Sequence, residues 1–177
     1  MRKGFGICCI ILGICCLIAS GGFIVYNHWG AENAQNASEN ILQDVRESIL
    51  DNIHDESTSE ESDRDESVEI AVDIPQEMLT TQVNGYDCIG ILSIPVLELE
   101  LPVLTDWSYA KLKIAPCHYF GSYYEKDFVI AAHNYQSHFG RLSDLQPKDL
   151  ILFTDISGTF HCYVVVLLET LPSDAIE

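Results

Sequence analysis

The sequence predicts a mainly β domain that follows an N-terminal transmembrane helix, and three observations carry this prediction. An uncharged, apolar run occupies residues 5–26. A strongly acidic stretch follows it, up to about residue 82. From Val83 onward, short runs of apolar and β-branched residues alternate with turn residues, which is typical of an all-β domain. We therefore divide the chain into residues 1–4, 5–26, 27–82 and 83–177.

Residues 5–26 have the length and composition of a membrane anchor. About 20 apolar residues are enough to cross a bilayer core of roughly 30 Å as a helix. Arg2 and Lys3 precede the run, and basic residues on the short leading side hold that end in the cytoplasm. We expect a single-pass protein of the cell membrane, with its N-terminus in the cytoplasm and its domain outside. A cleaved signal peptide is the alternative, since residues 19–22 offer small side chains to a peptidase.

The acidic stretch, residues 27–82, is expected to be an extracellular spacer that contains one helix. It holds more than half of the 27 Asp and Glu residues of a chain whose net charge is −18. Five apolar residues in it recur at steps of three and four: Ile41, Leu42, Val45, Ile49 and Ile53. This pattern predicts an amphipathic helix near residues 38–53, with Ser38 as its N-cap. We expect the apolar stripe to pack on the domain rather than on the membrane, because the many carboxylates of the same helix would be repelled by an anionic membrane surface.

Residues 55–69, DESTSEESDRDESVE, are predicted to be disordered. They contain a single apolar residue, too little to offset the entropy lost when the backbone becomes ordered. A calcium site among the carboxylates is the alternative. The segment lacks the turn glycine and the fixed ligand spacing of a calcium loop, so a solvated run of charge is favoured.

Residues 83–177 are predicted to form an incomplete β-barrel with short helices. Strands are expected at residues 88–94, 97–101, 149–154 and 159–168, and short helices at residues 107–113 and 139–145. Pro95 ends the first strand, and Asp155-Ile156-Ser157-Gly158 forms a hairpin turn between the last two. Closure into a barrel would remove exposed strand edges. In these 177 residues, the predicted last strand, residues 159–168, has no further strand to pair with and is expected to leave an apolar edge exposed.

One histidine, His133, is the leading candidate for a catalytic residue. The apolar run FVIAA before it predicts a buried strand, and the polar loop Asn134-Tyr135-Gln136-Ser137 follows it. A histidine at a strand end is rigidly held yet faces the surface, as a general acid or base near neutral pH must be. A structural, hydrogen-bonding histidine is the alternative.

The segments around His133 resemble the first two thirds of a sortase catalytic domain. They are GILSIPVLELELPVL (residues 90–104), HFGRLSDLQPKDLILFTD (138–155) and TFHCYVVV (159–166). Sortases begin with a G-x-L-x-I-P strand, continue to L-P-V, and place the catalytic histidine in a V-I-A-G-H-like strand end. Here Ala132 replaces the usual glycine, and Pro147-Lys148-Asp149 replaces the usual Lys-Gly-Asp. The resemblance covers about residues 85–177. It favours a sortase of the class B type.

The resemblance implies a cysteine transpeptidase on the surface of a Gram-positive cell. Such an enzyme cleaves a C-terminal sorting motif of surface proteins and joins it to an amine of a cell-wall precursor or pilin. His133 is its expected acid and base. The nucleophilic cysteine, in a T-L-x-T-C strand, and the following arginine are expected beyond residue 177, so we predict a truncated and inactive chain. An inactive remnant and an anchored β-barrel binding module with a structural His133 are the alternatives.

The other cysteines and histidines offer further alternatives. Cys117 beside His118 is a second candidate nucleophile, although sequence neighbours often point apart. A zinc site can be drawn from His133, His138, His161 and Cys162. These residues lack the tight pair spacing of zinc sites, so we expect no metal and no cofactor. A disulfide among Cys88, Cys117 and Cys162 remains open. The acidic charge argues against a nucleic-acid partner.

Overall fold

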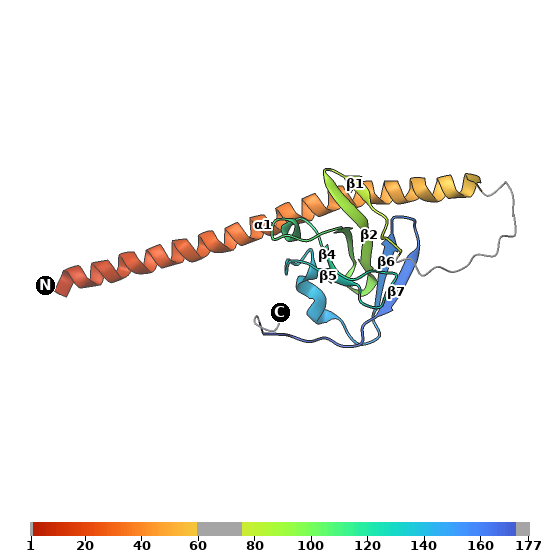
Figure 1. The fold of residues 1–177 in the computed structure, drawn as a ribbon. Coiled ribbons are helices and arrows are strands. Elements are labelled where there is room, and N and C mark those ends of the chain that lie inside the picture. Colours follow the sequence, from red (N-terminus) through yellow and green to blue (C-terminus); the bar gives the residue numbers. More distant parts are fainter. Residues whose placement is uncertain (1, 60–75, 173–177) are drawn as a thin grey trace.

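The fold combines one long helix with a curved sheet of short strands (Figure 1). The computed structural model describes residues 2–59 and 76–172, and it describes side chains for residues 12–22, 31–54 and 76–172. The helix α1 (Arg2–Ser59) has 58 residues and runs along one side of the domain. Its N-terminal half extends beyond the domain, and its C-terminal half lies against it.

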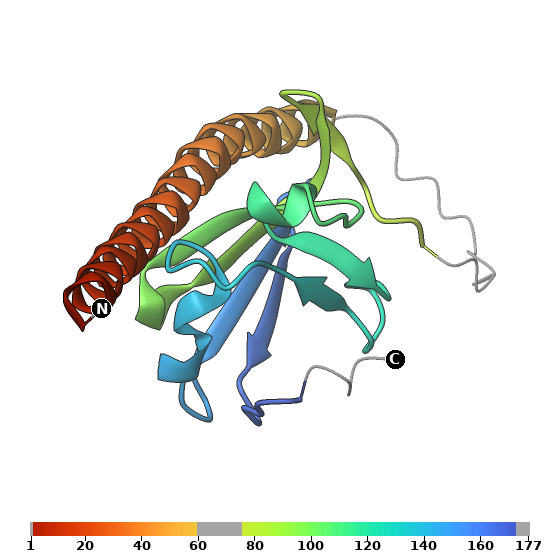
Figure 2. The same cartoon turned by 90° about the vertical axis from the view of Figure 1, so that its left-hand side faces the viewer.

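The domain contains a single seven-stranded sheet. Its strands are β1 (Thr81–Val83), β2 (Tyr86–Ile94), β3 (Leu99–Leu104), β4 (Cys117–Phe120), β5 (Val129–Ala131), β6 (Leu150–Asp155) and β7 (Phe160–Val164). The order is β5-β4-β3-β2-β6-β7, with β1 paired to β2. All pairs are antiparallel except β3 with β4. Figure 2 shows the sheet curling, so that its two ends, β5 and β7, lie on either side of an open gap.

The predicted mainly β architecture is confirmed, as a half-barrel rather than a closed barrel. Among the described residues, β5 pairs only with β4, and β7 pairs only with β6. The predicted exposure of the last strand is also seen, since Phe160, Val164 and Val166 all expose apolar side chains. Two strand edges of the half-barrel are therefore free to pair with further strands.

One face of α1 packs on the sheet. Its buried residues are Ala34, Ser38, Ile41, Val45 and Ile49. Of these, Ile41, Val45 and Ile49 belong to a core cluster that includes residues of β1, β2, β3 and β4. Burial of each large aliphatic side chain contributes about 1.5–3 kcal/mol, so this contact is a substantial part of the core. The predicted apolar stripe is confirmed, although Ile53 lies at its exposed margin.

Polar contacts add to the docking of α1. The Asn52 side chain donates to the Ile156 carbonyl oxygen at 3.0 Å. The Asn84 side chain donates to Asp44 at 2.8 Å. Arg46 pairs with Glu100 of β3 at 2.7 Å. These contacts fix both the rotation of the helix about its axis and its position along the sheet.

The helix predicted within residues 27–82 is present, but it is longer than expected. The helix expected near residues 38–53 is part of the continuous α1, so Ser38 is a buried interface residue rather than an N-cap. The prediction of disorder is wrong for residues 55–59, which continue the helix, and residues 60–69 lie outside the described part. Tertiary packing of the buried stripe stabilises a helix that its composition alone would not.

The predicted anchor, residues 5–26, is helical along its backbone. Over those residues whose side chains are described, no helical stretch combines the length and the apolar character needed to cross a membrane.

Several short elements differ from their predicted form. Residues 97–101 do not form one strand, because the 3₁₀ helix η1 (Pro95–Leu97) and the left-handed Glu98 (φ 49°) precede β3. The helix expected at residues 107–113 is reduced to the 3₁₀ turn η2 (Lys111–Lys113), and residues 139–145 form the 3₁₀ helix η3 (Phe139–Asp144). The last strand, β7, ends at Val164 rather than at residue 168.

Candidate active site

His133 lies two residues beyond β5, at the start of the loop that leads to η3. Pairing of Cys117 with Ala131 and of His118 with Ile130 fixes β5 against β4. The His133 ring is half-buried and stacks on the Tyr135 ring, with 3.7 Å between ring centroids and 17° between their planes. The strand therefore sets the position of the imidazole, and Tyr135 sets its orientation.

Backbone hydrogen bonds close the loop after His133 into a tight turn. The Phe139 N–H donates to the His133 carbonyl at 3.2 Å, and the N–H groups of His138 and Gly140 both donate to the Tyr135 carbonyl at 2.9 Å. A Cβ atom at Gly140 would lie 2.6 Å from the Asn134 carbonyl oxygen, so only glycine fits there. The turn holds His133 and Tyr135 against each other.

The surroundings of His133 favour its neutral form. Burial lowers its pKa, and the positive charge of Lys113 lowers it further. A side-chain hydrogen bond with Asn134 acts in the opposite direction but does not outweigh them. A neutral imidazole can accept a proton at neutral pH, which is the first requirement of a general base.

A second histidine, His138, lies in the same turn but is wholly buried. Its ring is 5.6 Å from the Tyr135 ring, and neither ring nitrogen makes a well-formed hydrogen bond to a described residue. Burial lowers the pKa of His138 to about 4, nearby His133 adds to this effect, and the Ile114 backbone opposes it. His138 is therefore a neutral packing residue behind Tyr135.

The residues of the hypothetical zinc site do not form a ligand set. His161 of β7 binds the buried Asp155 at 2.9 Å instead. Cys162 is exposed on the opposite face of β7 from Tyr163, because successive strand residues alternate in direction. Over the described ranges, no three His, Cys, Asp or Glu side chains are grouped so that they could hold a metal ion.

Cys117 does not have the properties of a nucleophile. Burial raises its pKa to about 11, and its thiol donates to the Ala115 carbonyl at 3.5 Å. The neighbouring His118 turns its ring nitrogens toward the carbonyls of Thr105 and Gly121, at 3.1 and 2.8 Å. A buried, protonated thiol without a histidine partner is inert, so the second candidate nucleophile is not supported.

The described cysteines are all free thiols. Cys88 and Cys117 both flank Leu104, from β2 and β4 on either side of β3. Two strand spacings are about 9–10 Å, which exceeds the Cα separation of roughly 7 Å that a disulfide can span. Burial also raises the pKa of Cys88 to about 12, which makes its thiol unreactive.

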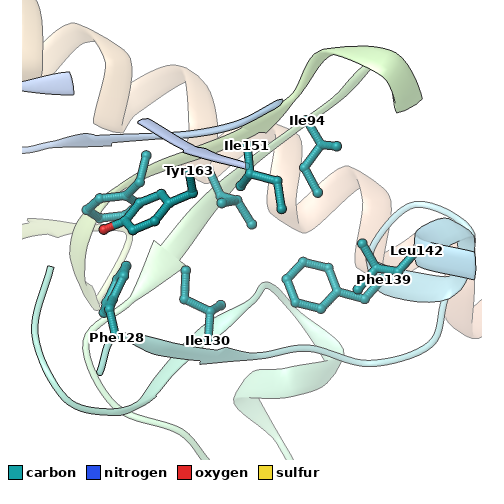
Figure 3. Close-up of a pocket in the computed structure, with 9 residues that line it drawn as sticks. Ile94, Phe128, Ile130, Phe139, Leu142, Ile151 and Tyr163 are labelled. Atoms are coloured by element: carbon teal, nitrogen blue, oxygen red, sulfur yellow. The ribbon is translucent and has the colours of Figure 1, made fainter. Parts of the chain in front are cut away.

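An apolar pocket of about 230 Å³ lies inside the half-barrel, lined by residues of β2, β5, β6, β7 and η3. Figure 3 shows the side chains that line it: Leu92, Ile94, Phe128, Ile130, Phe139, Leu142, Ile151, Phe153 and Tyr163. Ile130 belongs to the strand that leads to His133, and Phe139 begins η3 just after the histidine loop. An extended apolar segment in this pocket would therefore lie close to His133.

Sequence reasoning found His133 but missed the group that orients it. Tyr135 was only one member of a polar loop, and its stacking depends on a turn of five residues that no periodic pattern indicates. The close spacing of Tyr135 and Gly140 after the strand end was the available signal. The pocket residues were predicted only as members of strands and of a short helix, and no pocket was predicted.

Comparison with known proteins gives one matching family model and eleven similar solved chains, among them two sortases C. Residues 92–176 match the family model described as Sortase domain. The X-ray structure of sortase C from Clostridium perfringens SM101 is 18% identical to this chain. The alignment covers 82% of this chain and 75% of that one, at a TM-score of 0.42. The pilus-related sortase C of Group B Streptococcus shares 18% identity, with coverage of 75% and 72% and a TM-score of 0.39. No curated protein sequence matches the chain.

Proposed function

We propose, from the match of residues 92–176 to the Sortase domain model, that this chain is part of a membrane-anchored cysteine transpeptidase of the sortase family. The observation that carries the proposal is His133, held at the end of β5 by a closed turn and a stacked tyrosine. A rigid, half-buried and neutral imidazole suits a group that must take up and return one proton in each half-reaction.

His133 serves both halves of the proposed reaction. A cysteine thiol gives its proton to His133 as its sulfur attacks a backbone carbonyl in a sorting motif similar to L-P-x-T-G. His133 donates a proton to the leaving amine, which leaves a thioester-linked acyl-enzyme. It then takes a proton from the incoming amine as the new amide bond forms and the thiol is released. An arginine stabilises the negative charge on the carbonyl oxygen.

The cysteine and the arginine are proposed to lie beyond residue 177. The cysteines nearest the domain core, Cys88 and Cys117, are buried with raised pKa values, and Cys162 is on the outer face of β7. Strands that pair with the free edges of β5 and β7 would close the barrel. A nucleophile on the strand beside β5 would be within reach of His133.

The proposed partners and location follow from this chemistry. The substrates are surface proteins with a C-terminal sorting motif, and the acceptor is an amine of a cell-wall precursor or pilin. Residues 5–26 anchor the enzyme in the membrane of a Gram-positive cell, with residues 1–4 inside and the domain outside. An enzyme and substrates held at one membrane meet at a raised effective concentration.

Trapping the acyl-enzyme tests the proposal. The complete reading frame, read across codon 177, is expressed and incubated with a sorting peptide, and the protein mass is measured. We expect a cysteine adduct that hydroxylamine releases. A reading frame without a cysteine and arginine strand, or a complete protein that forms no adduct, would contradict the proposal and leave an inactive remnant or a binding module.

A further inference from the structure

We infer that the domain docks on the surface of its own membrane through an exposed aromatic patch, an inference that rests on the membrane anchor proposed above. The patch consists of Trp107, Tyr109 and Tyr119, whose side chains are 41%, 80% and 45% exposed. The Trp107 ring lies 5.8 Å from the Tyr109 ring and 5.4 Å from the Tyr119 ring, measured between centroids. Three aromatic rings that pack together in solvent mark an interaction surface.

The chemistry of the patch fits the headgroup region of a bilayer. Trp and Tyr are enriched at membrane interfaces because their rings are apolar and their N–H and O–H groups are polar. Lys111 and Lys113 lie beside the patch on η2, and long basic side chains can extend toward headgroups from such positions. Lys111 pairs with Asp106, so the local charge is close to balanced.

The helix α1 brings this surface to the membrane. The predicted anchor ends at Tyr26, and the first docked residue, Ala34, follows eight positions later. This is about 12 Å along a helix that rises 1.5 Å per residue. Because α1 is continuous from Arg2 to Ser59, no flexible link separates the anchor from the domain.

Contacts along α1 show which end of the domain faces the anchor. The loop residues Gln136 and Ser137 share a pocket with Gln35 of α1, and Ile114, just after η2, shares another with Ala37. The opposite end of the domain lies at Asn52, which binds the Ile156 carbonyl in the turn between β6 and β7. In Figure 1 the segments around η2 and η3 lie at the end of the domain that faces the N-terminal half of α1, and in Figure 2 that end faces the viewer.

The active-site loop shares this membrane-facing end. Gln136 and Ser137, three and four residues after His133, lie beside Gln35 of α1, so the histidine loop is at this end of the domain. Gln35 lies about 14 Å along α1 from Tyr26. Docking of the patch would therefore present His133 to substrates that are still tethered in the same membrane.

Quenching of Trp107 fluorescence by brominated lipid tests the inference. In the complete reading frame, every other tryptophan, Trp29 included, is replaced by phenylalanine, and the protein is reconstituted in vesicles of phosphatidylcholine. Neutral lipid is chosen because the chain carries a net charge of −18. We expect loss of Trp107 emission with bromine near the headgroups, and less loss with bromine deeper in the acyl chains.

A matched control carries its single tryptophan at the far end of the domain, as Phe160→Trp with Trp107→Phe. Phe160 is exposed and follows the turn in which Gly158 meets Ile53. Ile53 lies about 28 Å along α1 from Ala34, so this tryptophan should keep its full emission. A second variant, Tyr109→Asp, should reduce the quenching of Trp107 without unfolding the domain, because Tyr109 is largely exposed.

Each outcome decides the inference. Unquenched Trp107 in protein that floats with the vesicles would overturn the docking of the patch and leave the anchor intact. Protein that does not float with the vesicles would overturn both the anchor and the docking, whereas acyl-enzyme formation would be unaffected. Equal quenching at positions 107 and 160 would also contradict the inference, because the domain would then have no preferred orientation.

Discussion

At the scale of single residues, the reactivity of His133 is set by three neighbours from different parts of the chain. Tyr135 stacks on its ring, Lys113 disfavours its charged form, and Asn134 favours that form through a hydrogen bond. None of these contacts lies within the strand that made His133 recognisable. The sequence thus identifies the catalytic candidate, whereas the fold sets its chemistry.

The first prediction concerns the pKa of His133. The pKa of His133 in the wild-type protein should lie below 6.5. The replacement Lys113→Gln should raise this pKa, because it removes a positive charge that opposes protonation of the imidazole. NMR titration of the imidazole signals measures both values. The exposed Lys126 provides a control, Lys126→Gln, which should leave the titration unchanged. A wild-type pKa above 6.5 would contradict the described environment.

The second prediction concerns the buried carboxylate of Asp155. Burial alone would raise its pKa, but hydrogen bonds from His161, Ser157 and Thr159 outweigh this effect and lower it. Because the pKa of Asp155 is lower in the folded state, the ionised carboxylate stabilises the fold at pH values above its ordinary pKa of 3.8. This contribution is lost as the pH falls through the lowered pKa. Asp155→Asn should cost about 1–3 kcal/mol near pH 7.

Urea unfolding at neutral and at acidic pH measures the effect of Asp155→Asn. The difference in the free energy of unfolding should shrink in acid, because the wild-type carboxylate is then protonated too. The exposed Asp106 supplies a control, since its ion pair with Lys111 is solvent-screened and worth little. A cost at Asp155 that is independent of pH would contradict this account.

At the scale of elements, the histidine turn depends on one glycine. In the Gly140→Ala variant, the new Cβ would come within 2.6–2.7 Å of the carbonyl oxygens of Asn134 and Tyr135. We expect the turn to open, with a loss of stability of about 0.5–3 kcal/mol and a loss of the His133–Tyr135 stack. Ring-current shifts of the His133 signals measure the stack. Gly22→Ala has no neighbouring atoms within 4 Å and should leave the stack unchanged.

The docking of α1 yields a fourth prediction. Ile41 is buried in the contact with the sheet, so Ile41→Ala should lower the free energy of unfolding by about 2–5 kcal/mol. Leu50 is exposed on the same helix, and Leu50→Ala should change it by no more than about 0.5 kcal/mol. Denaturation of the complete protein in detergent micelles measures both. Equal effects would mean that the helix does not pack on the domain.

Local signals predicted the strands well wherever pattern and turn agreed. Pro95 ends β2 as expected, and the turn at residues 155–158 closes with a hydrogen bond from Gly158 to Asp155. The Asn84-Gly85 turn between β1 and β2 was overlooked, although both residues have positive φ and Asn-Gly is a strong hairpin signal. The alternation at residues 97–101 was misleading, because Glu98 adopts a left-handed conformation there.

At the scale of the whole molecule, the main correction concerns the link between anchor and domain. The sequence pattern predicted a helix only near residues 38–53 and disorder from residue 55, yet residues up to Ser59 form one helix with a buried face on the sheet. The apolar stripe predicted this docking, but not how far the helix extends to either side. Helix length depends on tertiary contacts that stabilise a nucleus from which the helix extends.

The half-barrel accounts for the free edges and the open apolar pocket together. Both follow from strand order, which places β5 and β7 at opposite ends of one curved sheet. Strand order depends on contacts between residues far apart in the chain, and the sequence pattern alone does not specify them.

The central claim is that His133 performs proton transfer in a cysteine transpeptidase. The most direct measurement is kcat/KM for transfer of a sorting peptide to an amine, with the complete reading frame and its His133→Ala variant. Loss of a general acid and base should lower this value by about 10²–10⁴-fold. His54→Ala, 19 positions along α1 from Gln35, which lies beside the histidine loop, should leave it unchanged. Transpeptidation that persists in His133→Ala at the wild-type rate would contradict the claim.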